Sequence, residues 1–217
     1  MELPVISARI GSPTISTKIE RAMNLFKRIA AALSGATPQD DMANCYPAAA
    51  LGETHEFQVY PPKILLKDQG VFAYRLEFAT FKADTSRVLG ALASQFECPD
   101  QALFQEGRVQ NGGKSAHFSI RQEFGGAVIV LVTNSIELIK KIDALDIEPP
   151  PPWVAFPDID PSILGSLQGA MEYWWDWLFS PFWSGLSANE RMNYLTRHSA
   201  DEDWADFLAT RERIVTG

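Results

Sequence analysis

The spacing of apolar residues changes from a helical to a strand-like period after the first quarter of the chain. Over residues 17–35, apolar side chains recur three or four positions apart, which predicts an amphipathic helix. Thr17 and Glu20 have the spacing of a capping box, and Gly35 is a typical helix end. Residues 36–54 are rich in Asp, Asn, Pro and Gly, and we expect them to form a loop.

Between residues 55 and 97 apolar and polar residues alternate, which is typical of strands. The two expected strands are 55–67, which Pro61 and Pro62 interrupt after residue 59, and 72–78, with a turn at Asp68-Gln69-Gly70 between them. Arg75 and Glu77 would lie on the solvent side of a half-buried strand. A helix capped by Asp84 is expected to follow.

Residues 115–147 repeat this order of strand, strand and helix. Gly125-Gly126 has the composition of a two-residue hairpin turn, and Asn134 followed by Glu137 predicts a helix cap. Two hairpin–helix units predict the α+β class, with an antiparallel sheet of about four strands. We expect the N-terminal helix and a C-terminal helical bundle to pack on this sheet.

Four consecutive prolines, 149–152, divide the α+β part, residues 1–148, from a helical part, residues 149–217. Such a run favours an extended, stiff spacer. The predicted helices beyond it are capped by Asp160, by Ser187 with Glu190, and by Ser199 with Glu202. The first of them is apolar on nearly all sides, which requires burial against other elements or a partner. We therefore expect the two parts to pack as one compact domain.

The acidity of the chain is concentrated in its last third. The net charge is −8, and residues 149–217 carry four basic and ten acidic residues, so they contribute −6. All six tryptophans fall in the same stretch. Binding to nucleic acid needs clustered Lys and Arg, so we expect no nucleic-acid ligand. An acidic surface suits a basic protein partner, because complementary potentials speed association.

No segment of the sequence has the pattern of an export signal or a membrane span. The N-terminus lacks a basic start and an apolar run. The longest apolar stretch, 163–183, contains Glu172 and Asp176 near its middle, and each would be costly inside a bilayer. We therefore expect a cytoplasmic protein with no membrane partner. Cys45 and Cys98 are too few for a disulfide framework and are expected to be reduced thiols.

Motifs for catalysis or metal binding are missing or out of register. The segment 112–115, Gly-Gly-Lys-Ser, departs from a phosphate-binding loop because Arg108 stands where the motif needs glycine and because a strand follows. The three histidines have no zinc-ligand spacing, so we expect no metal and no cofactor. An acid–base set of His55 and His117 with the nearby carboxylates Glu56 and Glu123 stays open as an alternative.

The aromatic and acidic cluster in the last third allows two compatible interpretations. It is the core of a helical unit, or it is an interface in which aromatic anchors are ringed by charge; a carbohydrate platform is a third possibility. The candidate partner-binding residues are Asp158, Asp160, Glu172, Trp175, Asp176, Trp177, Asp201, Glu202, Asp203 and Asp206. We expect Trp174 to face inward while Trp175 or Trp177 faces a partner.

In size, acidity, α+β pattern and lack of a catalytic motif, the chain resembles bacterial toxin immunity proteins. The resemblance implies that it is not an enzyme, and that it binds a cognate toxin and occludes the active site. A cytosol-acting nuclease delivered by a secretion system such as type VI is the expected partner, because the basic site of a nuclease suits an acidic inhibitor. A small enzyme using His55 or His117, and an adaptor or chaperone of a secreted protein, are the alternatives.

Overall fold

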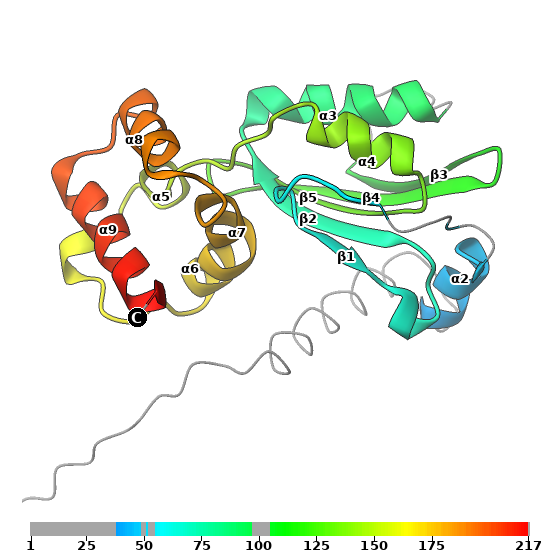
Figure 1. The fold of residues 1–217 in the computed structure, drawn as a ribbon, viewed down its shortest axis with the longest axis horizontal. Coiled ribbons are helices and arrows are strands. Elements are labelled where there is room, and N and C mark those ends of the chain that lie inside the picture. The colour runs from blue at the N-terminus through cyan, green and yellow to red at the C-terminus, as the bar shows by residue number, and fades with distance from the viewer. Residues whose placement is uncertain (1–37, 49–50, 52–54, 97–104, 217) are drawn as a thin grey trace, which may run out of the picture. The chain divides into compact units, whose positions relative to one another are not determined.

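Five strands form one open antiparallel sheet in the computed structural model (Figure 1), which describes residues 38–48, 51, 55–96 and 105–216. The strands are β1 (Lys63–Leu65), β2 (Tyr74–Thr80), β3 (Glu106–Asn111), β4 (Lys114–Glu123) and β5 (Gly126–Thr133), in the spatial order β1-β2-β5-β4-β3. The α+β class and the antiparallel sheet are confirmed. The sheet contains β3 in addition to the four expected strands, because the mostly polar sequence of this edge strand gives no clear alternation.

The helices lie between and after the strands. They are α2 (Pro38–Cys45), α3 (Lys82–Gln95), α4 (Ile136–Asp143), α5 (Pro152–Ala155), α6 (Ala170–Tyr173), α7 (Ser180–Trp183), α8 (Ala188–Arg197) and α9 (Glu202–Thr216). The helix predicted over residues 17–35 and the thiol of Cys98 lie outside the described residues. The loop expected over 36–54 is wrong where α2 forms. Residues 1–44 and residues 45–217 form two compact units, and the second carries the sheet.

The two hairpins expected from the sequence are joined edge to edge. β1 pairs with β2 and β4 pairs with β5, while β2 also pairs with β5 along its whole length, from Tyr74 opposite Thr133 to Thr80 opposite Ala127. The first part of the strand expected over 55–67 is wrong, because residues 55–59 are irregular and β1 begins only at Lys63. Joining the hairpins through β2 and β5 places both strands in the interior of the sheet.

The hairpin turn between β4 and β5 lies one residue before the expected position. Phe124 and Gly125 form it with φ of 56° and 71°, while Gly126 already pairs with Glu123 inside the sheet. Two consecutive left-handed residues match the twist of a tight hairpin. Gly126 is required for another reason, because a Cβ atom there would lie 2.2 Å from the carbonyl oxygen of Thr80.

The helices α3 and α4 are not capped by the residues that the sequence predicts, whereas α8 is. Ser135, not Asn134, caps α4 by accepting a hydrogen bond from the Leu138 amide at 3.2 Å. The Asn134 side chain instead accepts from the Ser115 amide at 2.8 Å, on a neighbouring strand. The helix α3 begins at Lys82, so Asp84 lies in its first turn and is not its cap. The capping box of Ser187 and Glu190 is confirmed at the start of α8.

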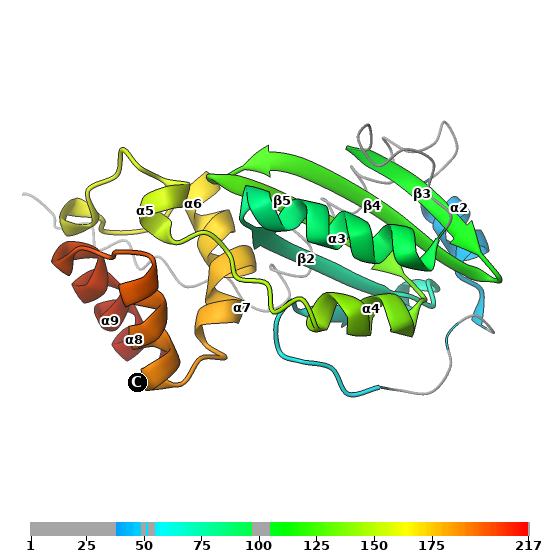
Figure 2. The ribbon, with the colours of Figure 1, turned by 90° about the horizontal axis from the view of Figure 1, so that it is seen from above.

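The first face of the sheet, on which Leu76 and Phe78 lie, is apolar and is covered by α3 and α4 (Figure 2). Its buried residues include Val88 and Leu92 of α3 and Ile139 and Ile142 of α4. These are the apolar helix and strand positions that the sequence predicts to form a core. Burial of this layer supplies the main hydrophobic stabilisation of the sheet.

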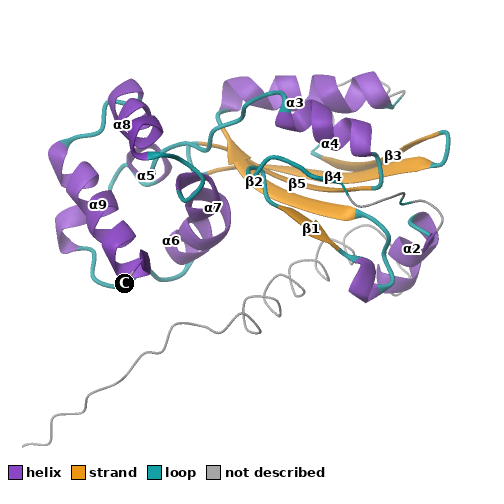
Figure 3. Cartoon of the chain, in the orientation of Figure 1, coloured by secondary structure: helices purple, strands orange, loops and turns teal. Residues whose placement is uncertain are grey.

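The second face of the sheet, on which Ala79 and Val128 lie, carries the C-terminal helices at one end (Figure 3). Residues 170–183 form one helical rod, in which Trp174–Phe179 is π-helical between α6 and α7. The wider i→i+5 turn brings residues five apart onto one side. Trp174 and Phe179 therefore stack at 4.7 Å between ring centroids. The continuous helix expected from Asp160 is wrong, because residues 161–163 form only one short turn.

The four prolines do not form an exposed spacer. Pro149 to Pro152 are all buried, and the Tyr194 hydroxyl of α8 donates to the Pro149 carbonyl at 2.7 Å. A Cβ atom on Gly126 would also lie 2.9 Å from Pro150 Cγ, so the prolines pack directly against the sheet. The run keeps its stiffness but contributes to packing between the sheet and the helices.

Candidate functional site

The strongest charge concentration in the described residues lies at the start of α9. Asp201, Glu202, Asp203 and Asp206 are all exposed, and we call residues 201–206 the acidic segment. No basic residue occurs between His198 and Arg211. The Asp201 carboxylate accepts a hydrogen bond from the Trp204 amide at 2.9 Å, so this residue, and not Ser199, caps the helix. The other three carboxylates point to solvent.

Asp158 and Asp160 lie on a stretch that runs alongside α9. At its start, the rings of Trp153 and Trp204 are 6.3 Å apart, and at its end Arg211 Nη2 donates to the Gly165 carbonyl at 3.2 Å. Both aspartates are exposed. Hydrogen bonds from the hydroxyl and amide of Ser162 hold the pKa of the Asp160 carboxyl below its usual value. The stretch that carries Asp158 and Asp160 therefore lies beside α9.

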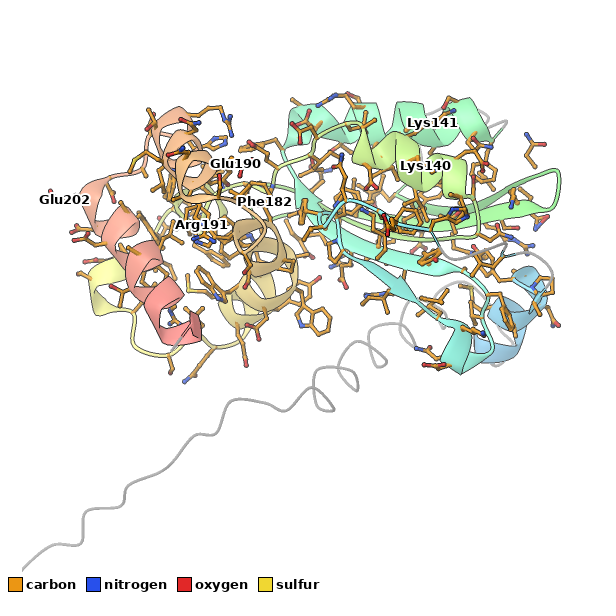
Figure 4. All side chains as sticks on the ribbon, in the orientation of Figure 1. Lys140, Lys141, Phe182, Glu190, Arg191 and Glu202 are labelled. Atoms are coloured by element: carbon orange, nitrogen blue, oxygen red, sulfur yellow. The ribbon has the colours of Figure 1, made fainter. Side chains whose placement is uncertain are left out.

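The aromatic candidates separate into a core residue and a surface residue. Trp175 is only 9% exposed, with the Phe207 ring 5.9 Å away and the Arg211 guanidinium 5.8 Å from its own ring centroid. The expectation that it contacts a partner is not supported, because the π-helical turn rotates it into the helical core. Trp177 remains half-exposed, as do Glu172 and Asp176. In Figure 4, Glu202 lies at the outer end of the helical part, far from Lys140 on α4.

A second group of polar residues, which the sequence placed in solvent, is buried on the second face of the sheet. The register puts Arg75 opposite Val132, Val132 opposite His117, and His117 opposite Arg108. Directly opposed residues of antiparallel strands point to the same side, so these four form one row across the sheet. Arg75 is 3% exposed and His117 is 8% exposed, whereas Arg108 is exposed on the edge strand.

On the same face, the buried Glu77 carboxylate contacts both Arg75 and the helical rod. The carboxylate pairs with Arg75 and accepts a second hydrogen bond from the Tyr173 hydroxyl at 2.6 Å. Arg121 Nη2 donates to the same hydroxyl at 3.4 Å. Burial and the neighbouring Glu77 charge raise the pKa of Tyr173, so it remains protonated and donates. The contact ties the helical rod to β2.

The Tyr46 hydroxyl fixes the protonation of His117. It donates to the Val132 carbonyl at 2.7 Å, and its oxygen lies 2.7 Å from His117 Nδ1. Because the hydroxyl proton is already used, the second bond requires Nδ1–H to be the donor. Burial and the Arg108 charge lower the pKa of His117 to about 4, so the ring is neutral near pH 7 and Nε2 carries no proton.

These distances do not support the acid–base set considered from the sequence. His117 and Glu123 lie six residues apart on β4, which corresponds to roughly 20 Å along a strand. His55 is exposed in the irregular segment before β1. His198 instead contacts Glu148, with Nε2 3.3 Å from the carboxylate, and stacks on Phe81 at 5.1 Å between centroids. Within the described ranges, no three His, Cys, Asp or Glu residues gather to hold a metal ion.

One signal in the sequence does indicate a buried second face. Residues 127–133 form a continuous apolar run, which is typical of a strand covered on both sides. Because β5 pairs with both β2 and β4, its neighbours share this burial, including Arg75 and His117. The pairing itself was not predictable from the alternation within β2 and β4.

No family model, curated protein or solved structure matches this chain. Of the helices that the structure describes, none combines the length and apolarity needed to cross a membrane. Two places in the described residues have features of a binding site: the acidic segment and the polar row on the sheet.

Proposed function

We propose that this protein binds and neutralises a cognate bacterial toxin through the acidic side of its helical part. The observation that carries the proposal is the exposed acidic segment, residues 201–206, with its four carboxylates and no basic residue. The opposite side of α9 supplies Trp204 and Leu208 to the core. The fold thus does not need Glu202, Asp203 or Asp206 for packing, and their charge is available to a partner.

A nuclease acting in the cytosol fits this surface best as the partner. Its active site must attract phosphates, so it is lined by basic side chains that an acidic protein surface complements. Asp158 and Asp160, on the stretch beside α9, extend the same negative potential. Half-exposed Trp177 supplies an aromatic anchor of the kind that dominates binding energy. Occlusion of the toxin active site requires no catalytic residue in this chain.

The test measures binding of the product of the neighbouring gene, with paired charge reversals. We expect the double variant Asp203→Lys, Asp206→Lys to lower the association rate constant by about tenfold or more at low salt, because electrostatic attraction of the partner depends on local charge. The matched control is Asp68→Lys with Glu137→Lys, two exposed acidic residues of the sheet part, which changes the net charge equally. An equal decrease of the association rate constant in both variants would show that only net charge matters, and that the acidic segment is not the binding surface.

A growth assay distinguishes neutralisation of a toxin from a role as an adaptor or chaperone. Expression of the neighbouring gene alone should stop growth, and co-expression of this chain should restore it. The charge-reversed variant should fail to restore growth while the control variant succeeds. If the partner is not toxic but becomes secreted or more soluble on co-expression, the protein is an adaptor or chaperone and the proposal is wrong.

A further inference from the structure

We propose that the polar row on the second face of the sheet binds a protonated phosphate group, with His117 Nε2 accepting its O–H and Arg108 pairing with its oxygens. The row is separate from the acidic segment at the start of α9. Two buried residues in it, Arg75 and His117, have hydrogen-bonding atoms without a partner among the described residues.

The acceptor in this site is His117 Nε2, and Tyr46 fixes the orientation of its ring. The Tyr46 hydroxyl donates to the Val132 carbonyl, and its oxygen accepts a hydrogen bond from His117 Nδ1–H. Nε2 is then a lone-pair acceptor, and it makes no hydrogen bond to any residue that the structure describes. An imidazole oriented through its other nitrogen is a common way to present such an acceptor.

The donors flank this acceptor in the same row. Arg108 lies directly opposite His117 on β3, where Cβ atoms of paired residues are about 5 Å apart. Arg75 lies two strands away, about 10 Å by strand spacing. Its guanidinium pairs with Glu77 through Nη2, while Nε is buried and unpartnered. A buried, unpaired N–H is costly, which favours a ligand or an ordered water beside it.

This combination selects one class of ligand. Two guanidinium groups disfavour a metal cation, although His117 Nε2 is free. Sulfate and an ionised carboxylate have no proton to give to Nε2. A phosphodiester, as in nucleic acid, also lacks an O–H, whereas inorganic phosphate and phosphate monoesters can retain one. The ligand would enter from the Arg108 side, since Arg108 is the exposed member of the row.

The test follows the side-chain nitrogen resonances of the histidines by NMR in the full chain, with inorganic phosphate and with sulfate as probes. The free protein should show His117 protonated at Nδ1 alone. Phosphate should shift the Nε2 resonance and bind about tenfold more tightly than sulfate, the contribution of one additional hydrogen bond. The Nε2–H form in the free protein, equal affinity for both anions, or no phosphate binding would each overturn the proposal.

Two variants distinguish phosphate binding at this site from non-specific attraction of phosphate to positive charge. Arg108→Gln changes an exposed side chain and should weaken phosphate binding about tenfold with the fold intact. Lys140→Gln removes the same charge from exposed Lys140 on α4, across the sheet (Figure 4), and should leave the affinity unchanged. If the two variants lose affinity equally, phosphate binds by charge alone and the site is rejected.

Discussion

The two faces of one sheet are buried by different chemistry in this protein. The first face presents Leu76, Phe78 and their neighbours to α3 and α4 as a mainly apolar layer, with one ion pair, Lys63–Asp143, between β1 and α4. On the second face Ala79 and Val128 meet the helical rod, and the rest combines Val130 and Val132 of β5 with the buried polar residues Arg75, Glu77 and His117. A comparable degree of burial is thus reached with few polar side chains on the first face and with several on the second, so more of the second face depends on each polar partner being in place.

The largest effect should appear when a buried charge of the second face loses its partner, compared with an exposed pair on the same face. Glu77→Ala leaves Arg75 unpaired in the interior and should lower the free energy of unfolding by about 4 kcal/mol. Glu123→Ala removes a carboxylate that pairs with Arg121 at the surface and should cost less than about 1 kcal/mol. Denaturant titration measures both. Equal values would mean that the Arg75–Glu77 pair is not buried in solution.

A double variant sharpens this result. Replacing Arg75 by Met together with Glu77 by Leu removes both charges and fills the space with apolar groups. We expect a stability within about 1 kcal/mol of the original protein, since buried pairs seldom outperform hydrophobic contacts. Such a result would mean that the Arg75–Glu77 pair adds little net stability and instead favours this one packing arrangement over others.

A smaller effect should appear as a pH dependence that arises from His117 on the second face. The pKa of His117 is lowered to about 4 in the folded protein, from an ordinary value near 6.5. Between these values the unfolded chain binds more protons, so this residue favours folding fully above pH 6.5 and progressively less as the pH falls towards 4. From pH 7 to pH 5 the loss should be about 2 kcal/mol. In His117→Gln this part of the pH dependence should vanish; if it remains, His117 is not the group responsible.

The smallest effect concerns the hydroxyl that links the helical rod to β2. Tyr173→Phe removes the donor to Glu77 and should destabilise the protein by about 1 kcal/mol. Tyr74→Phe removes a hydroxyl that makes no hydrogen bond to any described residue, and should change stability by less than about 0.5 kcal/mol. Thermal unfolding of the two variants side by side measures the difference. A shift as small for Tyr173→Phe as for Tyr74→Phe would show that the link is not formed.

Much of the first face was predictable, and the candidate sites were predictable only in part. The periodicity over Val88 and Leu92, and over Ile139 and Ile142, correctly marks the helix sides that form the core. The exposure of Glu202, Asp203 and Asp206 also follows from the sequence, because they lie away from the apolar positions Trp204 and Leu208 on one helix. The burial of Trp175 was not predictable, since an α-helical period does not hold through the π-helical segment.

By itself the sequence determined the α+β class, the two hairpin–helix units and the acidity of the last third, because these depend on local periodicity and composition. Only the tertiary structure decided that β2 pairs with β5, that the prolines are buried, and that Arg75 and His117 lie on either side of Val132 on one face. Alternation within a strand fixes which residues share a side, but it does not fix what covers that side. A polar side looks the same in sequence whether water or another part of the chain lies against it.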